Sequence, residues 1–218
     1  MKKVLVFASF VFAASVCAAS AAPASVIDCY NEIPSSFFNG AKYELRRSGK
    51  KWLTASTADA EIEALVDIAN GYIRIEDPGT GGGTRVDEVA LFISKSGAVI
   101  IGINRKDIDG VVGTSSSLLF VSKEGGRWAD VTQKVLPKTG LSSFFKPGFK
   151  PSDKVTILSW FELPRRGTTV VWNLDTVGVE ARIGCEQNVA ENKAVLANIK
   201  TKRIEFLYDA KTGTFTVK

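Results

Sequence analysis

Apolar and polar residues alternate along several short stretches of the chain, and turns rich in glycine separate them. The stretch from Ala64 to Ile75 alternates on both sides of Asn70-Gly71, a pair that tolerates the positive φ angles of a tight hairpin turn. Four more pairs of strand-like runs have short connections, at 86–93 with 98–104, 118–122 with 127–131, 155–162 with 168–174, and 203–208 with 214–217. Because short connections favour antiparallel pairing, the pattern predicts a series of β-hairpins.

Two other patterns refine this prediction. The run Val99-Ile100-Ile101-Gly102-Ile103 is apolar on both faces, which predicts a central strand that is covered on both sides. Helical spacing of apolar residues predicts a helix over 188–199, and Thr57 to Glu63 forms a second, weaker candidate that opens with a capping residue.

The fold class that follows is mainly β. We expect an antiparallel β-sandwich or a partly closed barrel, built from hairpins, with one or two short helices; an α+β fold is the alternative. The glycine-rich stretch from Asp77 to Thr84 is predicted to be a loop, because it lacks the Gly-Lys-Ser/Thr and the helix that a phosphate-binding loop needs. No domain boundary is evident, so residues 22–218 are expected to form one globular domain.

The first residues have the organisation of a secretory signal peptide. Lys2 and Lys3 precede an uncharged apolar run of about 13 residues, shorter than the roughly 20 that cross a membrane, and small residues follow. We predict a signal peptide over residues 1–21, with Ala19-x-Ala21 as the cleavage motif and Ala22-x-Ala24 as the alternative. The protein is then expected to be bacterial and either periplasmic or secreted. Lipid anchoring through Cys17 is disfavoured, because Val16 stands where a lipobox has Gly, Ala or Ser. No later segment is long and apolar enough to span the membrane.

Two cysteines remain after cleavage, Cys29 and Cys185. In an oxidising compartment an isolated pair predicts a disulfide, here closing a loop of about 155 residues. A reactive thiol is the weaker alternative, because neither cysteine lies in a C-x-x-C motif and the chain contains no histidine.

The charge of the chain is mild. Removing Lys2 and Lys3 from the 28 basic residues leaves 26 against 23 acidic ones, a net charge of +3. A chain of this kind lacks the concentrated basic face of a nucleic-acid-binding protein, and we expect no nucleic-acid partner. The basic groups 46–51, 165–166 and 200–203 are expected to be solvated, but they would form an anion-binding face if folding gathered them.

The absence of histidine excludes several chemistries. The Ser-His-Asp triad, the Cys-His dyad and the H-E-x-x-H zinc site all need that residue. No metal or cofactor site is predicted. The patterns Ser143-x-x-Lys146, Ser152-Asp153-Lys154 and Lys211-Thr212-Gly213 resemble those of serine–lysine hydrolases, but the first two are nearly adjacent and the third falls in a predicted turn.

Carboxylates are the remaining catalytic candidates. Asp107-Ile108-Asp109-Gly110 has oxygen ligands at alternate positions, as calcium loops do, but lacks the rest of that motif, so a polar turn is favoured. Glu162 could pair with Asp107 or Asp109 in the arrangement of a glycosidase. The four tryptophans, in or beside predicted strands, are expected to pack in the core rather than to stack on sugars.

Part of the chain resembles small secreted bacterial proteins of unknown function. The resemblance lies in Phe120-x7-Trp128-x-Asp130-Val131-Thr132-x2-Val135-Leu136-Pro137, in residues 163–169, and in the closing run from Ile204 to Phe215. It covers about a quarter of the chain, and it implies an exported β-rich domain without assigning an activity or site residues.

These observations lead to two hypotheses. The first is a non-enzymatic envelope protein that binds another protein or an anionic cell-wall component. The alternative is a hydrolase of envelope polysaccharide that uses Glu162 with Asp107 or Asp109.

Overall fold

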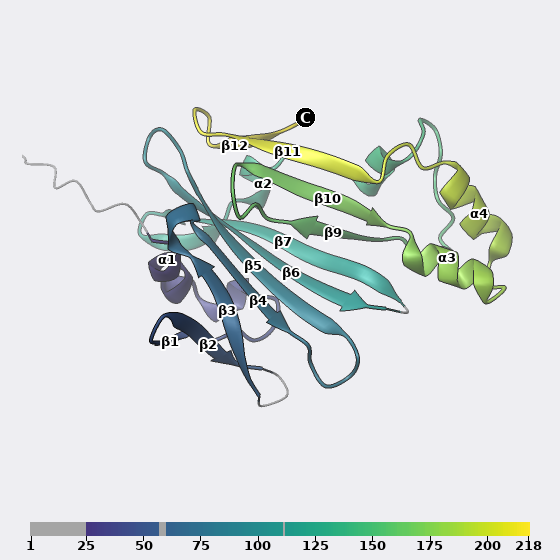
Figure 1. Ribbon diagram of the computed structural model, residues 1–218. Coiled ribbons are helices and arrows are strands. Elements are labelled where there is room, and N and C mark those ends of the chain that lie inside the picture. Colours follow the sequence, from purple (N-terminus) through teal and green to yellow (C-terminus); the bar gives the residue numbers. More distant parts are fainter. Residues whose placement is uncertain (1–24, 57–59, 111) are drawn as a thin grey trace, which may run out of the picture.

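The computed structural model describes residues 25–56, 60–110 and 112–218, whose strands form two antiparallel sheets (Figure 1). The large sheet is a meander in which each strand pairs with the next one along the chain. Its strands are β1 (Arg46–Ser48), β2 (Lys51–Ala55), β3 (Glu61–Asp67), β4 (Tyr72–Asp77), β5 (Thr84–Ile93), β6 (Val99–Asp109), β7 (Gly113–Glu124) and β8 (Arg127–Asp130).

The small sheet has the order β12-β11-β10-β9. Its strands are β9 (Leu158–Glu162), β10 (Thr169–Asp175), β11 (Arg203–Asp209) and β12 (Thr214–Val217). The helices are α1 (Val26–Glu32), α2 (Thr132–Val135), α3 (Val177–Gly184) and α4 (Val189–Ala197), with 3₁₀ turns η1 (Ser35–Phe37), η2 (Ile68–Asn70) and η3 (Leu141–Phe144). The predicted mainly β, antiparallel fold class is confirmed: the described residues form two open sheets and no closed barrel.

All of the predicted hairpins form, but the first turn differs from the prediction. Asp67 pairs with Tyr72, so the turn contains four residues rather than the two of a type I′ turn. The Asp67 carboxylate accepts hydrogen bonds from the backbone N and the Nδ2 of Asn70, at 3.2 and 2.9 Å, and these bonds stabilise the 3₁₀ turn η2. Only Gly71 then adopts the left-handed conformation, with φ 64°.

The predicted helix over 188–199 is present as α4, whereas the helix predicted over 57–63 is wrong. Strand β3 begins at Glu61, and residues 57–59 lie outside the described residues. The reason is tertiary, because Ile62 and Ala64 pair with β2 and pack in the core beneath α1. The sequence patterns did not predict α1 or α3.

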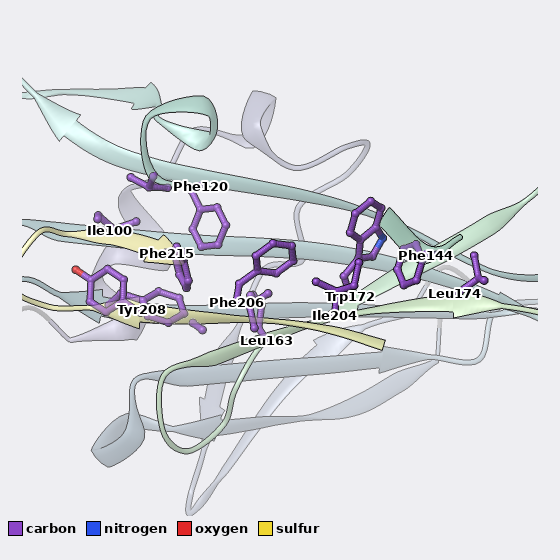
Figure 2. Packing of buried hydrophobic residues seen from close by; sticks show 14 of the residues in the cluster. Ile100, Phe120, Phe144, Leu163, Trp172, Leu174, Ile204, Phe206, Tyr208 and Phe215 are labelled. Atoms are coloured by element: carbon purple, nitrogen blue, oxygen red, sulfur yellow. The ribbon is translucent and has the colours of Figure 1, made fainter. Parts of the chain in front are cut away.

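One face of the large sheet packs against the small sheet, and we call it the inner face. The core between the two sheets is largely aromatic and runs continuously along the interface (Figure 2). Phe92 and Phe215 make an edge-to-face contact, with ring centroids 5.2 Å apart, and Phe161 stacks on Trp172 at the same separation.

The opposite, outer face of the large sheet is covered by α1 and by the chain that leads from it to β1. Tyr30, on α1, is almost completely buried and donates a hydrogen bond of 2.6 Å from its hydroxyl to the carbonyl of Tyr43. Strand β6 is thus covered on both faces, as its apolar run predicted, since Ile100 contributes to one core and Ile101 to the other.

Strand β9 is the edge of the small sheet that meets the inner face. The backbone N of Phe161 donates to the hydroxyl of Ser116, on β7, at 2.7 Å, and its carbonyl accepts from Nδ2 of Asn104, on β6, at 2.7 Å. The buried Glu88 carboxylate accepts from the same Nδ2 at 2.8 Å and from the backbone N of Leu163 at 3.2 Å. These bonds join β9 and the residue after it to the inner face of the large sheet.

Candidate functional site

A groove of about 600 Å³ lies at one end of the small sheet, where basic residues from separate segments meet. We call it the basic groove. Its charged side chains are Lys200, Arg203, Glu205 and Lys218; hydroxyls come from Thr139, Ser143 and Thr201, and Ile204 and Val217 add apolar surface.

The segment that carries Lys200 is held in place by η3. The backbone N–H groups of Lys200 and Thr201 both donate to the carbonyl of Phe144, at 2.7 and 3.2 Å. Phe144 is fully buried and packs edge-to-face on Trp172, with ring centroids 4.7 Å apart, so η3 is anchored in the core (Figure 2). A buried aromatic residue therefore fixes the wall of the groove that Ser143 and Lys200 form.

The other wall is the pair of strands β11 and β12. Their register places Glu205 opposite Lys218, one step beyond the pair Phe206 and Val217. The Glu205 carboxylate accepts from Nζ of Lys218 at 3.0 Å and from Nε of Arg203 at 3.1 Å. The pKa of Glu205 lies below its usual range, first because of the hydrogen bond from Lys218 and then because of Arg203. Glu205 thus stays ionised and holds both cationic side chains at the groove.

Cationic side chains outnumber carboxylate side chains in this groove by three to one. No acidic side chain in the described part of the chain forms an ion pair with Lys200. Ammonium and guanidinium groups with neighbouring hydroxyls are the donors that bind carboxylates and phosphates. The groove can therefore hold an anion, and Ile204 and Val217 offer contact to an apolar part of the same ligand.

The sequence pointed to only part of this groove. It grouped 200–203 as basic residues but did not connect them with Ser143 or with Lys218. The predicted hairpin, with Asp209 to Gly213 as its turn, would place Glu205 opposite Val217. The structure pairs Asp209 with Thr214, a shift of one residue that places Lys218 opposite Glu205. The contact with η3 depends on tertiary packing and has no local sequence signal.

Glu162, the principal catalytic candidate, lies on β9 and is half-buried. Its carboxylate accepts a long hydrogen bond of 3.4 Å from Nε1 of Trp160. Since β9 meets the inner face of the large sheet, Glu162 belongs to that side of the molecule.

Asp107 lies on the other side of the large sheet. Side chains alternate along β6, so Asn104 and Lys106 share the inner face whereas Arg105 and Asp107 share the outer face. Asp107 is exposed and forms an ion pair with Arg85 at 3.7 Å. The sheet therefore separates Asp107 from Glu162.

Asp109 ends β6 and stabilises the turn to β7, where its carboxylate accepts a hydrogen bond from the backbone N of Val112 at 2.8 Å. This is the polar turn that the sequence favoured over a calcium loop. Among the described residues no group of three or more acidic or cysteine side chains could hold a metal ion.

The predicted disulfide between Cys29 and Cys185 is absent from the structure, in which both cysteines are free. Cys29 points from α1 into the core beneath the outer face, whereas Cys185 caps the exposed end of α3. The two helices lie at opposite ends of the molecule (Figure 1). The prediction from composition alone failed, because it assumed that the two cysteines after the predicted signal peptide come together.

The predicted signal peptide and Cys17 lie outside the described residues. Within residues 25–56, 60–110 and 112–218, no helix combines the length and the apolar character needed to cross a membrane.

Comparisons with known proteins show the fold only. No protein-family model matches the chain, and no curated protein matches it. The chain is similar to a solved domain of an uncharacterized protein from Porphyromonas gingivalis W83, with 13% sequence identity and a TM-score of 0.53. The match covers 88% of this chain and 96% of that chain. The similarity therefore extends over nearly the whole two-sheet architecture and assigns no activity.

Proposed function

We propose that this protein is an exported, non-enzymatic envelope protein that binds an anionic cell-wall component in the basic groove. The observation that carries the proposal is the convergence of Lys200, Arg203 and Lys218 on one groove, from segments that the fold brings together. The signal-peptide pattern of residues 1–21 supports export, since it places the folded domain where envelope polymers are present.

An anionic polymer fits this groove better than a small neutral ligand. The groove is open and its cationic side chains are largely exposed, with Arg203 at 57% and Lys218 at 66%. Exposed charges attract a ligand at long range and are screened by salt, so binding through them should weaken as ionic strength rises.

The hydrolase alternative receives less support. Glu162 and Asp107 lie on opposite sides of the large sheet, and Asp109 is engaged at the turn after β6. A glycosidase needs its two carboxyl groups within about 10 Å of each other on either side of one bond. This arrangement of carboxylates does not suit that chemistry.

The proposal is tested by calorimetric titration of the chain from residue 22 onward. Sodium polyphosphate and polygalacturonate are the two probes, and they distinguish phosphate from carboxylate polymers. We expect saturable binding that weakens between 50 and 200 mM salt, and the double variant Lys200→Ala/Arg203→Ala should lower affinity about tenfold or more. The matched control is Lys50→Ala/Arg127→Ala, which removes one exposed lysine from the turn between β1 and β2 and one exposed arginine from the start of β8.

An equal loss of affinity in both double variants would show diffuse charge attraction and would contradict a specific groove. Absence of binding to both polymers would also refute the proposal and would favour a protein partner. Export is tested separately, by expressing the full chain in a Gram-negative host and measuring the mass of the periplasmic product. The expected mass is that of a chain that begins at Ala22. An unprocessed product that stays in the cytoplasm would contradict export.

A further inference from the structure

A second pocket, of about 410 Å³, lies between α1 and the end of the large sheet formed by β7, β8 and the turn from β5 to β6. It shares no residue with the basic groove. Its polar and aromatic lining comes from Asp28, Cys29 and Glu32 on α1, Ser122 and Lys123 on β7, and Trp128 on β8. We call it the α1–β8 pocket; its volume is in the range of small-molecule sites.

The ammonium group of Lys123 shows which chemistry this pocket accommodates. Lys123 and Trp128 are cross-strand partners, and Nζ of Lys123 lies 5.4 Å from the centroid of the Trp128 ring. The same ammonium pairs with the carboxylate of Glu32. An aromatic ring together with a carboxylate is a recognition site for organic cations.

The protein's own cation is held loosely. About half of each side chain is exposed in the pair, 47% for Lys123 and 55% for Glu32. Exposed ion pairs of this kind contribute little stability, because water and salt screen them. An external cation can therefore take the place of the Lys123 ammonium, which can move into solvent on its flexible stem.

The charge of the pocket also favours a cation. Asp28 lies one helical turn before Glu32 on α1, so the pocket has two carboxylates and one ammonium. The Cys29 thiol adds no negative charge at neutral pH, because burial, followed by the nearby carboxylate of Glu32, raises its pKa. The carboxylate of Asp28 can therefore pair with a cationic ligand even while Lys123 pairs with Glu32.

We propose that the α1–β8 pocket binds an alkylammonium or guanidinium group, which displaces the Lys123 ammonium from the Trp128 ring and pairs with Glu32 and Asp28. The cation can come from a free amine or from a basic side chain of a peptide, since both present the same group. This inference is independent of the basic groove.

Alkylation of Cys29 provides a readout, because Cys29 is one of the residues that line the pocket. In a Cys185→Ser background, the rate of reaction with iodoacetamide is measured with increasing n-butylammonium, methylguanidinium or a blocked peptide that contains one lysine. We expect each probe to slow the reaction in a saturable manner, whereas n-butanol, the neutral analogue, should have no such effect. Tighter binding of the peptide than of n-butylammonium would identify a peptide as the source of the cation, and equal binding would identify a free amine.

Substitutions separate this site from a general apolar pocket. Trp128→Leu should weaken cation binding by about threefold to thirtyfold, and Glu32→Gln should also weaken it. Lys123→Ala should tighten cation binding by up to about fivefold, because it removes the internal competitor. Trp52→Leu is the matched control, since Trp52 also packs against the outer-face core but does not line the pocket.

Equal protection by n-butanol, or weaker cation binding in Lys123→Ala, would overturn the proposal. Glu32→Gln and Lys123→Ala change exposed side chains and should leave the fold intact, so the test stands even if Trp128→Leu unfolds the protein. The double variant Lys200→Ala/Arg203→Ala should leave cation binding in the α1–β8 pocket unchanged. The proposal for this pocket and the proposal for the basic groove can therefore fail independently.

Discussion

Arg105 and Asp87 form a buried, bidentate ion pair on the outer face of the large sheet. Nε of Arg105 donates to Oδ1 of Asp87 at 2.7 Å and Nη2 donates to Oδ2 at 2.5 Å. The guanidinium also donates to the carbonyls of Asn39 and Ala41 in the segment that leads from α1 to β1. One side chain on the central strand β6 therefore ties the covering segment to the sheet.

Removing one partner of this pair should be strongly destabilising. We expect Arg105→Met to lower the free energy of unfolding by about 3–5 kcal/mol, because it leaves the Asp87 carboxylate buried without its partner. The double variant Arg105→Met/Asp87→Leu should lose less than the sum of the single losses, since no unpaired charge remains. Urea unfolding at pH 7 measures both, and additive losses would show that the two residues act independently.

The sequence indicated the hairpin that carries this pair but neither its register nor its burial. With Ser94 to Gly97 as the turn, residue 93 would lie opposite residue 98, and residue 87 opposite residue 104. The structure instead pairs Ile93 with Val99, which places Asp87 opposite Arg105 and Glu88 opposite Asn104. These polar residues are buried because α1 and the chain after it cover the outer face of the large sheet, and the small sheet covers the inner face.

Local patterns predicted the antiparallel hairpins well, because turn chemistry and alternation act between neighbouring residues. Local patterns wrongly predicted a disulfide between Cys29 and Cys185, and they did not predict the basic groove. Both features depend on how segments that are distant in the sequence pack together. The wall formed by Ser143 and Lys200 depends on Phe144 entering the core beside Trp172. Contacts between segments that are distant in the sequence produce no local pattern of residues from which they could be predicted.

Buried tyrosines should make the protein sensitive to alkaline pH. The hydroxyl of Tyr43 donates to Oδ2 of Asp77 at 2.7 Å, and burial together with this hydrogen bond raises the pKa of Tyr43 from 10.0 to about 12. Burial raises the pKa of Tyr30 and Tyr72 as well. The folded state therefore favours the neutral phenols, so their contribution to stability is complete below pH 10 and is lost as the pH rises toward 12.

This loss can be assigned to a single residue by Tyr43→Phe. The variant should lower the free energy of unfolding by about 1–3 kcal/mol at pH 7, because it removes the hydroxyl donor from Asp77. Its stability should then fall less steeply than that of the parent between pH 10 and 12. Urea unfolding at a series of pH values tests this. Tyr208→Phe is the control for the lost hydrogen bond at pH 7, where it should cost less stability, because the Tyr208 hydroxyl has no hydrogen-bond partner among the described residues. An identical pH dependence in parent and variant would contradict the assignment to Tyr43.

Gly102 marks a point of close approach between the two sheets. A Cβ atom at this position would lie 3.1 Å from Cδ2 of Leu163 and 3.1 Å from Cε1 of Phe120. Gly102→Val should therefore lower the free energy of unfolding by about 1–3 kcal/mol through overpacking. Gly81→Val is the matched control, because nothing lies within 4 Å of a Cβ atom there. Thermal and urea unfolding measure the difference, and equal stability of the two variants would show that the sheets do not approach closely at Gly102.

The two cysteines should react with thiol reagents at very different rates. Cys185 is exposed at the end of α3, whereas Cys29 is buried on α1, where burial raises the pKa of its thiol. Since the thiolate is the nucleophile, we expect Cys29 to react with iodoacetamide at least about tenfold more slowly than Cys185 at pH 8. In urea the two rates should become similar, because unfolding removes both the burial and the charged neighbours of Cys29.

Mass spectrometry of peptides after timed labelling, without reductant, gives both rates. If neither cysteine is labelled in urea until a reductant is added, the chain forms the disulfide that its composition suggested, and the packing of α1 or α3 must differ from that described.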